Sequence, residues 1–211
     1  MEDPTSRRPP SRGWIIPTSA VLFAVLFVVG VVSAGGASDT ENKTSAEILQ
    51  TFSDQKGGAV ASGYLLVLAG FLFLPVSWAA LRRVGAGLTE LSESVARAAA
   101  ILFVGLLMVS GIVFASLSGA VVFGGLDDPP VTFIKYVPQI GFGLLLIAGG
   151  LSVGLFLVIV GLAGQASRTI PRWFSRLTYV SAAAMLVAVA FIPMVMLPVW
   201  ALGASVALRP R

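Results

Sequence analysis

The sequence of 211 residues contains neither cysteine nor histidine. This absence excludes disulfides, thiolate chemistry, zinc sites of the usual kinds, histidine-ligated haem and imidazole acid-base catalysis. Charge is also scarce, because 11% of the residues are charged and 56% are apolar, whereas roughly a quarter are charged in a soluble domain. Too little polar surface remains to cover a water-soluble globule, so the composition predicts an integral membrane protein.

Five long segments lack any charged residue, namely 13–38, 57–81, 98–126, 136–167 and 177–208. Each exceeds the ~20 residues that a helix needs to cross a ~30 Å hydrocarbon core. The segments lack the alternation typical of membrane β-strands, and helices satisfy their backbone hydrogen bonds internally. The sequence therefore predicts an all-α, polytopic membrane bundle of five transmembrane helices, at about 13–35, 58–81, 98–124, 137–165 and 177–205.

These spans are expected to form one domain over 13–208, with an N-terminal tail at 1–12, an outer loop at 38–56 and a C-terminal tail at 209–211. Nine arginines cluster at 7–12, 82–97 and 168–176, on one face of the predicted bundle, and five basic residues lie on the other. Cytoplasmic loops carry the excess of Lys and Arg, which predicts a cytoplasmic N-terminus and an outer C-terminus. A multi-pass protein of the bacterial plasma membrane fits this pattern.

The first span has a second interpretation as a cleaved signal peptide. Three arginines precede it, and Ser33-Ala34-Gly35 offers small residues for cleavage. Its apolar core at 15–34 is about twenty residues long, against the 7–15 residues of a signal sequence, and this favours a retained helix. Cleavage would leave four spans in the same orientation.

Spans four and five are longer than one perpendicular helix requires, which predicts tilt or protrusion from the membrane. Pro193 and Pro198 in span five, and Pro75 in span two, lack the backbone N–H of a regular helix, so kinks are expected there. Broken helices line sites in transporters. Prolines also occur in spans for packing alone, which is the favoured interpretation.

The outer loop between spans one and two is the most polar stretch of the sequence. Thr44 and Glu47 have capping-box spacing, and Ile48, Leu49 and Phe52 follow on one face, which predicts a short helix on the bundle or at the interface. On the inner side, Leu88, Leu91 and Val95, with Glu93 four residues before Arg97, predict a helix that begins before span three. Asp127 and Asp128 are interpreted as part of a turn, in preference to a weak cation site.

No Asp, Glu, Lys or Arg occurs within a span core, although ion-coupled transport generally places such groups at membrane depth. The hydroxyl groups within the spans form no catalytic pattern, and the methionines are expected to fill gaps. We therefore predict no catalytic, cofactor-binding or metal-ligating residues, and no cofactor.

Two stripes of small residues are expected to support close helix contacts. Gly111, Ala115 and Gly119 recur every four residues in span three, and Gly150 and Gly154 do so in span four. The contact partner is either another helix of the chain or a second membrane protein, including a homo-oligomer. Spans three and four are expected to pack together.

The segment SAEILQTFSDQKGGAVASGYLLVLAGFLFLPVSWAALRRV, at 45–84, resembles a broad group of uncharacterised actinobacterial integral membrane proteins. That group pairs a long first span with an outer helix and a second span that ends in ALRR. The resemblance covers the first two spans, is generic afterwards, and implies a topology without an activity.

Three classes of function remain after these observations. A non-enzymatic accessory or structural helical bundle is favoured, because the spans supply no reactive or ion-handling chemistry. The alternative is a passive or small-molecule transporter that uses the Pro-kinked spans two and five. An enzyme would depend on carboxylate pairs such as Glu90 with Glu93, and it is disfavoured. The lipid bilayer is the expected partner, and the dispersed basic residues do not suggest nucleic acid.

Overall fold

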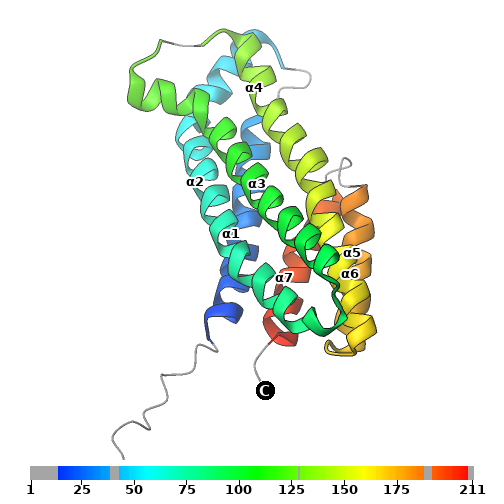
Figure 1. Cartoon of the computed structure of the whole chain (residues 1–211). Coiled ribbons are helices and arrows are strands. Elements are labelled where there is room, and N and C mark those ends of the chain that lie inside the picture. Colours follow the sequence, from blue (N-terminus) through cyan, green and yellow to red (C-terminus); the bar gives the residue numbers. More distant parts are fainter. Residues whose placement is uncertain (1–13, 39–42, 128, 188–191, 209–211) are drawn as a thin grey trace, which may run out of the picture.

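The computed structural model describes residues 14–38, 43–127, 129–187 and 192–208, and these residues are helical without any strand (Figure 1). Four helical runs are long and apolar enough to cross a membrane. They are α1 (Ile15–Ser38), α2 (Ser45–Val84), α3 (Glu90–Gly124), and a continuous run of α4 (Val131–Gly143), a π-helical segment (Leu144–Gly149) and α5 (Gly150–Ser167). The predicted all-α class is confirmed, and four of the five predicted spans correspond to helices that could cross a membrane.

The fifth predicted span is not one helix. It consists of α6 (Arg172–Leu186) and α7 (Met196–Ala207), which at about 1.5 Å per residue are about 22 and 18 Å long. Neither reaches across a ~30 Å hydrocarbon core. The prediction of a single spanning helix over 177–205 is therefore corrected to two short helices.

These two helices run antiparallel, as their side-chain contacts show. The indole Nε1 of Trp200 donates to Oγ1 of Thr178 at 3.0 Å, and Oγ of Ser181 donates to the carbonyl of Met196 at 3.4 Å. Gly203 faces Leu177, so later residues of α7 meet earlier residues of α6. The chain thus turns back, and α7 ends at the end of the bundle where α1 begins (Figure 1). The predicted placement of the two termini on opposite faces is not supported.

The hairpin of α6 and α7 enters the bundle only partway. A Cβ added to Gly161 of α5 would lie 3.0 Å from the Tyr179 ring, and one added to Gly154 would lie 3.2 Å from Cβ of Met185, near the end of α6. Hence α6 starts beside the end of α5, where Tyr179 also bonds Gln165, and ends near the level of Gly154. We call α6 and α7 together the re-entrant hairpin, and we call the end of the bundle at which it starts the inner end.

Proline chemistry explains part of this difference from the expected kinked span. Pro198 occupies the third position of α7, where a backbone N–H has no partner within the helix, so proline costs little there. Pro193 lies in the short 3₁₀ turn Ile192–Val195 that precedes α7. By contrast, α2 remains helical through Pro75. Two of the three prolines therefore mark the start of a helix.

Aromatic side chains fill the inner half of the bundle. The ring of Phe73 lies 5.1 Å from that of Phe23, 4.9 Å from Phe103 and 6.0 Å from Phe156, measured between centroids. Trp200 of the hairpin joins them, 6.0 Å from Phe156 in an edge-on arrangement. All five side chains are fully buried. We call these residues the aromatic core, to which α1, α2, α3, α5 and α7 each contribute one side chain.

The first helix belongs to this packing. Phe23 of α1 lies in the aromatic core, and the carbonyl of Gly30 accepts a 2.7 Å hydrogen bond from the buried Oγ of Ser62 on α2. Cleavage of the first span as a signal sequence stays a hypothesis. It would remove both interactions from the bundle.

Small residues bring α2 and α3 together in the middle of the bundle. A Cβ added to Gly63 would lie 2.5 Å from both the carbonyl oxygen of Gly111 and Cβ of Ala115. The stripe of span three therefore packs against α2. The predicted packing of spans three and four is also confirmed, since Phe103 of α3 approaches Gly149 and Phe114 of α3 approaches Gly141. Gly119 meets open space. We call the contact at Gly63, Gly111 and Ala115 the glycine crossing.

The small residues of span four serve a different contact. Gly154 faces Met185 of α6, and Gly161 faces the ring of Tyr179 on the same helix. Gly150 is buried at the start of α5. This stripe therefore packs α5 against the re-entrant hairpin.

The helices extend farther at the outer end than the sequence predicts. Helix α2 has 40 residues and is about 60 Å long, about twice the ~30 Å hydrocarbon core. The expected short helix after Thr44 is in fact the first turns of α2, and most of the predicted loop 38–56 is helical from Ser45 onward. The overlong span four likewise begins at Val131 and not near 137. These lengths exceed one perpendicular crossing, which fits the predicted tilt or protrusion.

Two local predictions at helix starts are confirmed. The capping box at Thr44 is complete, since Thr44 N–H donates to a Glu47 carboxylate oxygen at 2.7 Å and Glu47 N–H donates to the Thr44 hydroxyl. Helix α3 begins at Glu90, before the apolar segment, and Arg97 pairs with Glu93 as expected. Arg97 also lies over the ring of Trp78, 5.7 Å from its centroid. These contacts fix the helices outside the apolar segments.

Candidate functional site

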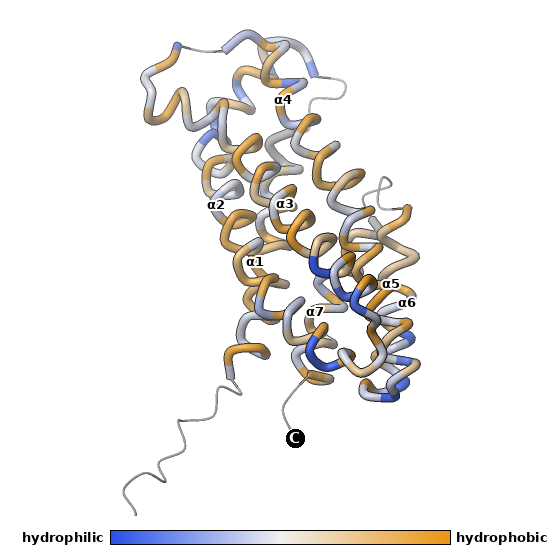
Figure 2. Tube along the Cα trace, viewed as in Figure 1, coloured by the Kyte–Doolittle hydropathy of each residue, from blue (hydrophilic) through white to orange (hydrophobic). Residues whose placement is uncertain are grey.

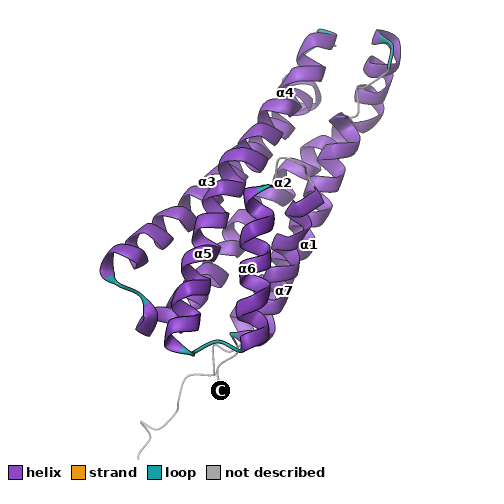
Figure 3. Ribbon diagram, turned by 90° about the vertical axis from the view of Figure 1, so that its right-hand side faces the viewer, coloured by secondary structure: helices purple, strands orange, loops and turns teal. Residues whose placement is uncertain are grey.

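The outer end of the bundle separates into two arms (Figure 3). One arm contains the connection between α1 and α2, and the other contains the end of α3 and the start of α4. A small pocket of about 30 Å³ lies between the arms. We call it the outer pocket, and it is the candidate functional site.

The outer pocket begins where the glycine crossing ends. Ala59 lies one turn outward from Gly63 on α2, and Ser118 lies one turn outward from Ala115 on α3, and both line the pocket. Beyond the crossing no small-residue contact holds these two helices together. The close approach at Gly63 therefore acts as the point from which the arms diverge.

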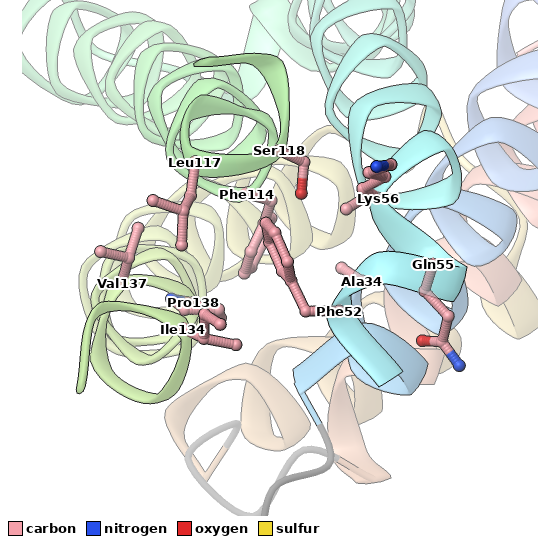
Figure 4. Close-up of a pocket in the computed structure, with 11 residues that line it drawn as sticks. Ala34, Phe52, Gln55, Lys56, Phe114, Leu117, Ser118, Ile134, Val137 and Pro138 are labelled. Carbon is pink, nitrogen blue, oxygen red and sulfur yellow. The ribbon is translucent and has the colours of Figure 1, made fainter. Parts of the chain in front are cut away.

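Aromatic and aliphatic side chains form most of the pocket wall. Phe114 of α3 projects into the space between the arms, opposite Phe52 of α2 (Figure 4). The ring of Phe114 is held in place, because Gly141 of α4 leaves room for it and the ring of Phe142 lies 4.7 Å away. Ile134 and Pro138 complete the wall on α4. The pocket is thus closed toward the membrane interior by packed side chains.

Three polar side chains also line the outer pocket. Gln55 and Lys56 are contributed by α2, and Ser118 by α3 (Figure 4). Lys56 is half-buried and Ser118 is buried. A space of about 30 Å³ holds roughly one or two water molecules, so one cation, one amide and one hydroxyl beside apolar walls suit the contact surface of a partner protein more than an enclosed ligand. The sequence alone did not single out these residues as a group, because they are distant along the chain.

The arm above the pocket starts with an ionised carboxylate. Glu47 lies outside the apolar part of α2, at 57–81, and is fully exposed. Hydrogen bonds from the backbone and side chain of Thr44 lower the pKa of Glu47 below its usual value, with a small contribution from Lys43. A carboxylate in the first turn also interacts favourably with the positive end of the helix dipole. Its role is to begin α2.

Buried hydroxyls elsewhere in the bundle are engaged in helix contacts. Ser110 and Ser152 donate to the carbonyls four residues earlier, both at 2.7 Å, and Thr178 does so at 2.8 Å. Ser62 donates across to α1. Such bonds satisfy polar groups in an apolar environment. These hydroxyls therefore stabilise the bundle and do not form a reactive cluster.

The acidic residues weighed in the sequence stay at helix ends. Glu93 pairs with Arg97, and Glu90 is in the first turn of α3. Asp127 follows the left-handed Gly125 that ends α3, and Asp128 lies outside the described residues. Within the described ranges, no three acidic side chains gather into a group able to hold a metal ion.

Comparison with protein families, with curated proteins and with solved structures found no match to this chain. The outer pocket is therefore interpreted from its own geometry. That geometry consists of rigid projecting helices, an apolar wall and three polar side chains.

Proposed function

We propose that this protein is a non-enzymatic integral membrane bundle that serves as an accessory or structural subunit and contacts a partner protein through its outer arms. The observation that carries the proposal is the length of α2, which extends about 30 Å beyond what membrane crossing requires. Helices of this length are unnecessary for anchoring alone. Projecting helices with a pocket between them present a surface to another protein.

The interior of the bundle supports this proposal. The aromatic core occupies the position where a transport path would run, and Phe73, Phe103 and Trp200 are fully buried there. The buried hydroxyls are engaged in hydrogen bonds within the bundle. A filled interior suits a structural bundle better than a conduit.

The re-entrant hairpin favours one alternative, a passive or small-molecule transporter. Non-helical backbone at membrane depth occurs in known membrane proteins where it is buried in protein or lines a water-filled cavity. Here the hairpin fits between α5 and α1 and carries Trp200 into the aromatic core. A transport path in this chain would require Trp200 to move.

We further propose that the inner end faces the cytoplasm of a bacterium and that the membrane is the plasma membrane. Arg82, Arg97 and the arginines at 168–176 are at the inner end, and Figure 2 shows hydrophilic segments at both ends of the apolar helices. Arg209 and Arg211 lie outside the described residues but directly follow α7, which also ends there. Of the nine basic residues in the described part of the chain, six lie at the inner end and three, Lys43, Lys56 and Lys135, at the outer end, so the positive-inside rule favours the inner end as cytoplasmic. The resemblance of 45–84 to actinobacterial membrane proteins belongs to the same proposal.

The deciding experiment is purification of the full chain in native membrane discs, without detergent, from its own host. We expect a second protein at a stoichiometric ratio, measured by native mass spectrometry. Lys56→Glu reverses the charge in the outer pocket and should reduce the recovered partner. The matched control is Lys135→Glu, which makes the same charge change on α4 outside the pocket lining and should retain the partner.

The same preparations test the transporter alternative. Reconstituted vesicles are assayed for flux of glycerol, a small neutral solute, by light scattering. A chain that purifies alone and accelerates glycerol flux contradicts the accessory proposal and supports transport. Loss of the partner with both lysine variants contradicts a role for the outer pocket.

A further inference from the structure

A second pocket lies at the inner end, between the end of α5 and the start of α6. Its volume is about 650 Å³, and it is open to the surface. Gln165 and Tyr179 close one side, joined by a 2.9 Å hydrogen bond between the Tyr179 hydroxyl and Oε1 of Gln165. We call this space the inner pocket.

The inner pocket is strongly cationic. Arg168, Arg172 and Arg176 all line it, and guanidinium groups remain charged at every physiological pH. No carboxylate lines the pocket, and Glu93, an acidic residue at the same end, is paired with Arg97. Three fixed positive charges around one space favour an anion with several oxygen acceptors.

Free backbone amides add to this preference. Helix α6 starts after Pro171, which provides no side-chain cap, and both Pro171 and Arg172 line the pocket. The first N–H groups of a helix have no partner within it and carry the positive end of the helix dipole. Amides and guanidinium groups thus converge on the same space.

The conformation of Arg168 is a second, independent observation. Arg168 ends α5 in the left-handed region, with φ of 53°, and in the described part of the chain it is the only residue other than glycine with positive φ. Glycine is the usual residue at such a helix end, because a side chain is strained there. An arginine in this position loses some stability and places a charge at the pocket.

The surroundings of the inner pocket are those of a membrane surface. Trp173 is exposed on α6 next to the pocket, as expected of an interfacial aromatic residue. One turn farther into the membrane, Leu162 of α5 and Val180 of α6 are more than half exposed. An anionic group in the pocket could therefore be attached to acyl chains that lie along these side chains.

We propose that the inner pocket binds the phosphate headgroup of an anionic membrane lipid. Arg168, Arg172 and Arg176 neutralise the phosphate, and the amides at the start of α6 donate to its oxygens. The acyl chains cover the exposed apolar surface of α5 and α6. A bound lipid would hold the start of the re-entrant hairpin against α5.

The test uses the full chain in nanodiscs that contain phosphatidylglycerol and phosphatidylcholine in equal amounts, with retained lipid counted by native mass spectrometry. We expect enrichment of phosphatidylglycerol on the wild-type protein. Each arginine near an anionic surface contributes about fivefold in affinity, so Arg172→Gln and Arg176→Gln should each lower the enrichment by about that factor. Arg82→Gln removes an exposed charge at the same end but outside the pocket, and should change it less than twofold.

Arg168→Gly separates binding from folding. Glycine relieves the left-handed strain, so the unfolding temperature without anionic lipid should remain the same or rise, while lipid enrichment falls. Equal retention of both lipids by the wild-type protein would overturn the proposal. So would an equal loss with Arg82→Gln, which indicates general surface charge, or displacement of the lipid by millimolar inorganic phosphate, which indicates a free-anion site.

Discussion

The inner and outer halves of this bundle are built from different residues. The inner half is tightly filled, whereas the helices of the outer half separate. The inner half is filled by large rings, with Phe73 in contact with four other aromatic side chains, and the re-entrant hairpin occupies the remaining space. The outer half depends on the smallest residues, since Gly63 and Gly111 bring α2 and α3 into contact before the arms diverge. Large side chains close one half, and small ones allow the other to open.

This difference shows how a bundle without Asp, Glu, Lys or Arg in its apolar segments can have a rigid half and an open half. Packing of rings and a buried hydrogen bond between Trp200 and Thr178 make the inner half a rigid base. The outer half needs only one close crossing to set the direction of two long helices. A partner bound outside the membrane, as proposed, would contact the outer ends of α2 and α3, whose directions are set by this rigid base.

The largest expected effect concerns the side on which α7 ends. Single cysteines introduced at Glu47 and at Arg209, the latter just after the described part of α7, should react with a membrane-impermeant thiol reagent from opposite sides of the membrane. The wild-type chain has no cysteine, so no background labelling arises from it. Labelling of both positions from the same side would mean that α6 and α7 cross the membrane together as a fifth span.

Trp200→Ala should produce the next largest effect, because it removes a fully buried ring from the aromatic core. Truncation of a buried Trp costs about 3–5 kcal/mol in the free energy of unfolding. Unfolding with increasing SDS in mixed micelles measures the loss. Trp173→Ala is the matched control, since Trp173 is 48% exposed and should cost much less. Equal losses would show that the hairpin does not pack as described.

Gly63→Ala tests the glycine crossing and should have an intermediate effect. The new Cβ would lie 2.5 Å from the Gly111 carbonyl oxygen, so the two helices must separate. Overpacking of this kind typically costs about 1–3 kcal/mol. Gly105→Ala is the control, because open space surrounds Gly105 and alanine favours the helix. A neutral Gly63→Ala in the same SDS assay would contradict the close crossing.

The smallest effect is expected at the start of α2. Because the Glu47 pKa is lowered in the folded state, its cap stabilises the arm above the pKa of the unfolded chain. This stabilisation is lost as pH falls through the lower, folded pKa. Thr44→Ala should return the Glu47 pKa toward its usual value, measured by carboxyl NMR titration. Because alanine keeps the backbone N–H, an unchanged titration would exclude only the Thr44 hydroxyl as a cause of the shift.

Local sequence patterns predicted the local structure well. The capping box at Thr44, the pairing of Glu93 with Arg97 and the early start of α3 each depend on residues three or four positions apart. Apolar length predicted four of the helical runs for the same reason. The continuity of α2 was missed, because nothing in the polar residues after Thr44 indicates that the expected short helix joins the next span.

The re-entrant hairpin and the outer pocket could not be predicted in this way. Segment 177–208 has no charge, and apolar composition does not reveal whether a chain crosses a membrane or turns back. Pro198 was a usable signal, since proline fits the first turn of a helix as well as a kink. One sequence does not specify which helices pack together. It therefore could not predict that Gly63 contacts Gly111, or that Lys56 and Ser118 line the same pocket.

The contact of α7 with α1 has a consequence for synthesis. The two helices are separated by roughly 160 residues, between Ser38 and Met196, and a ribosome at about 5–20 residues per second needs roughly 8–30 s to make them. During that interval the surface of α1 that will receive α7 must face lipid or an insertion factor. The hairpin then inserts sideways into a bundle that is already half assembled. Helix α7 therefore completes the packing of α1 long after α1 itself is made.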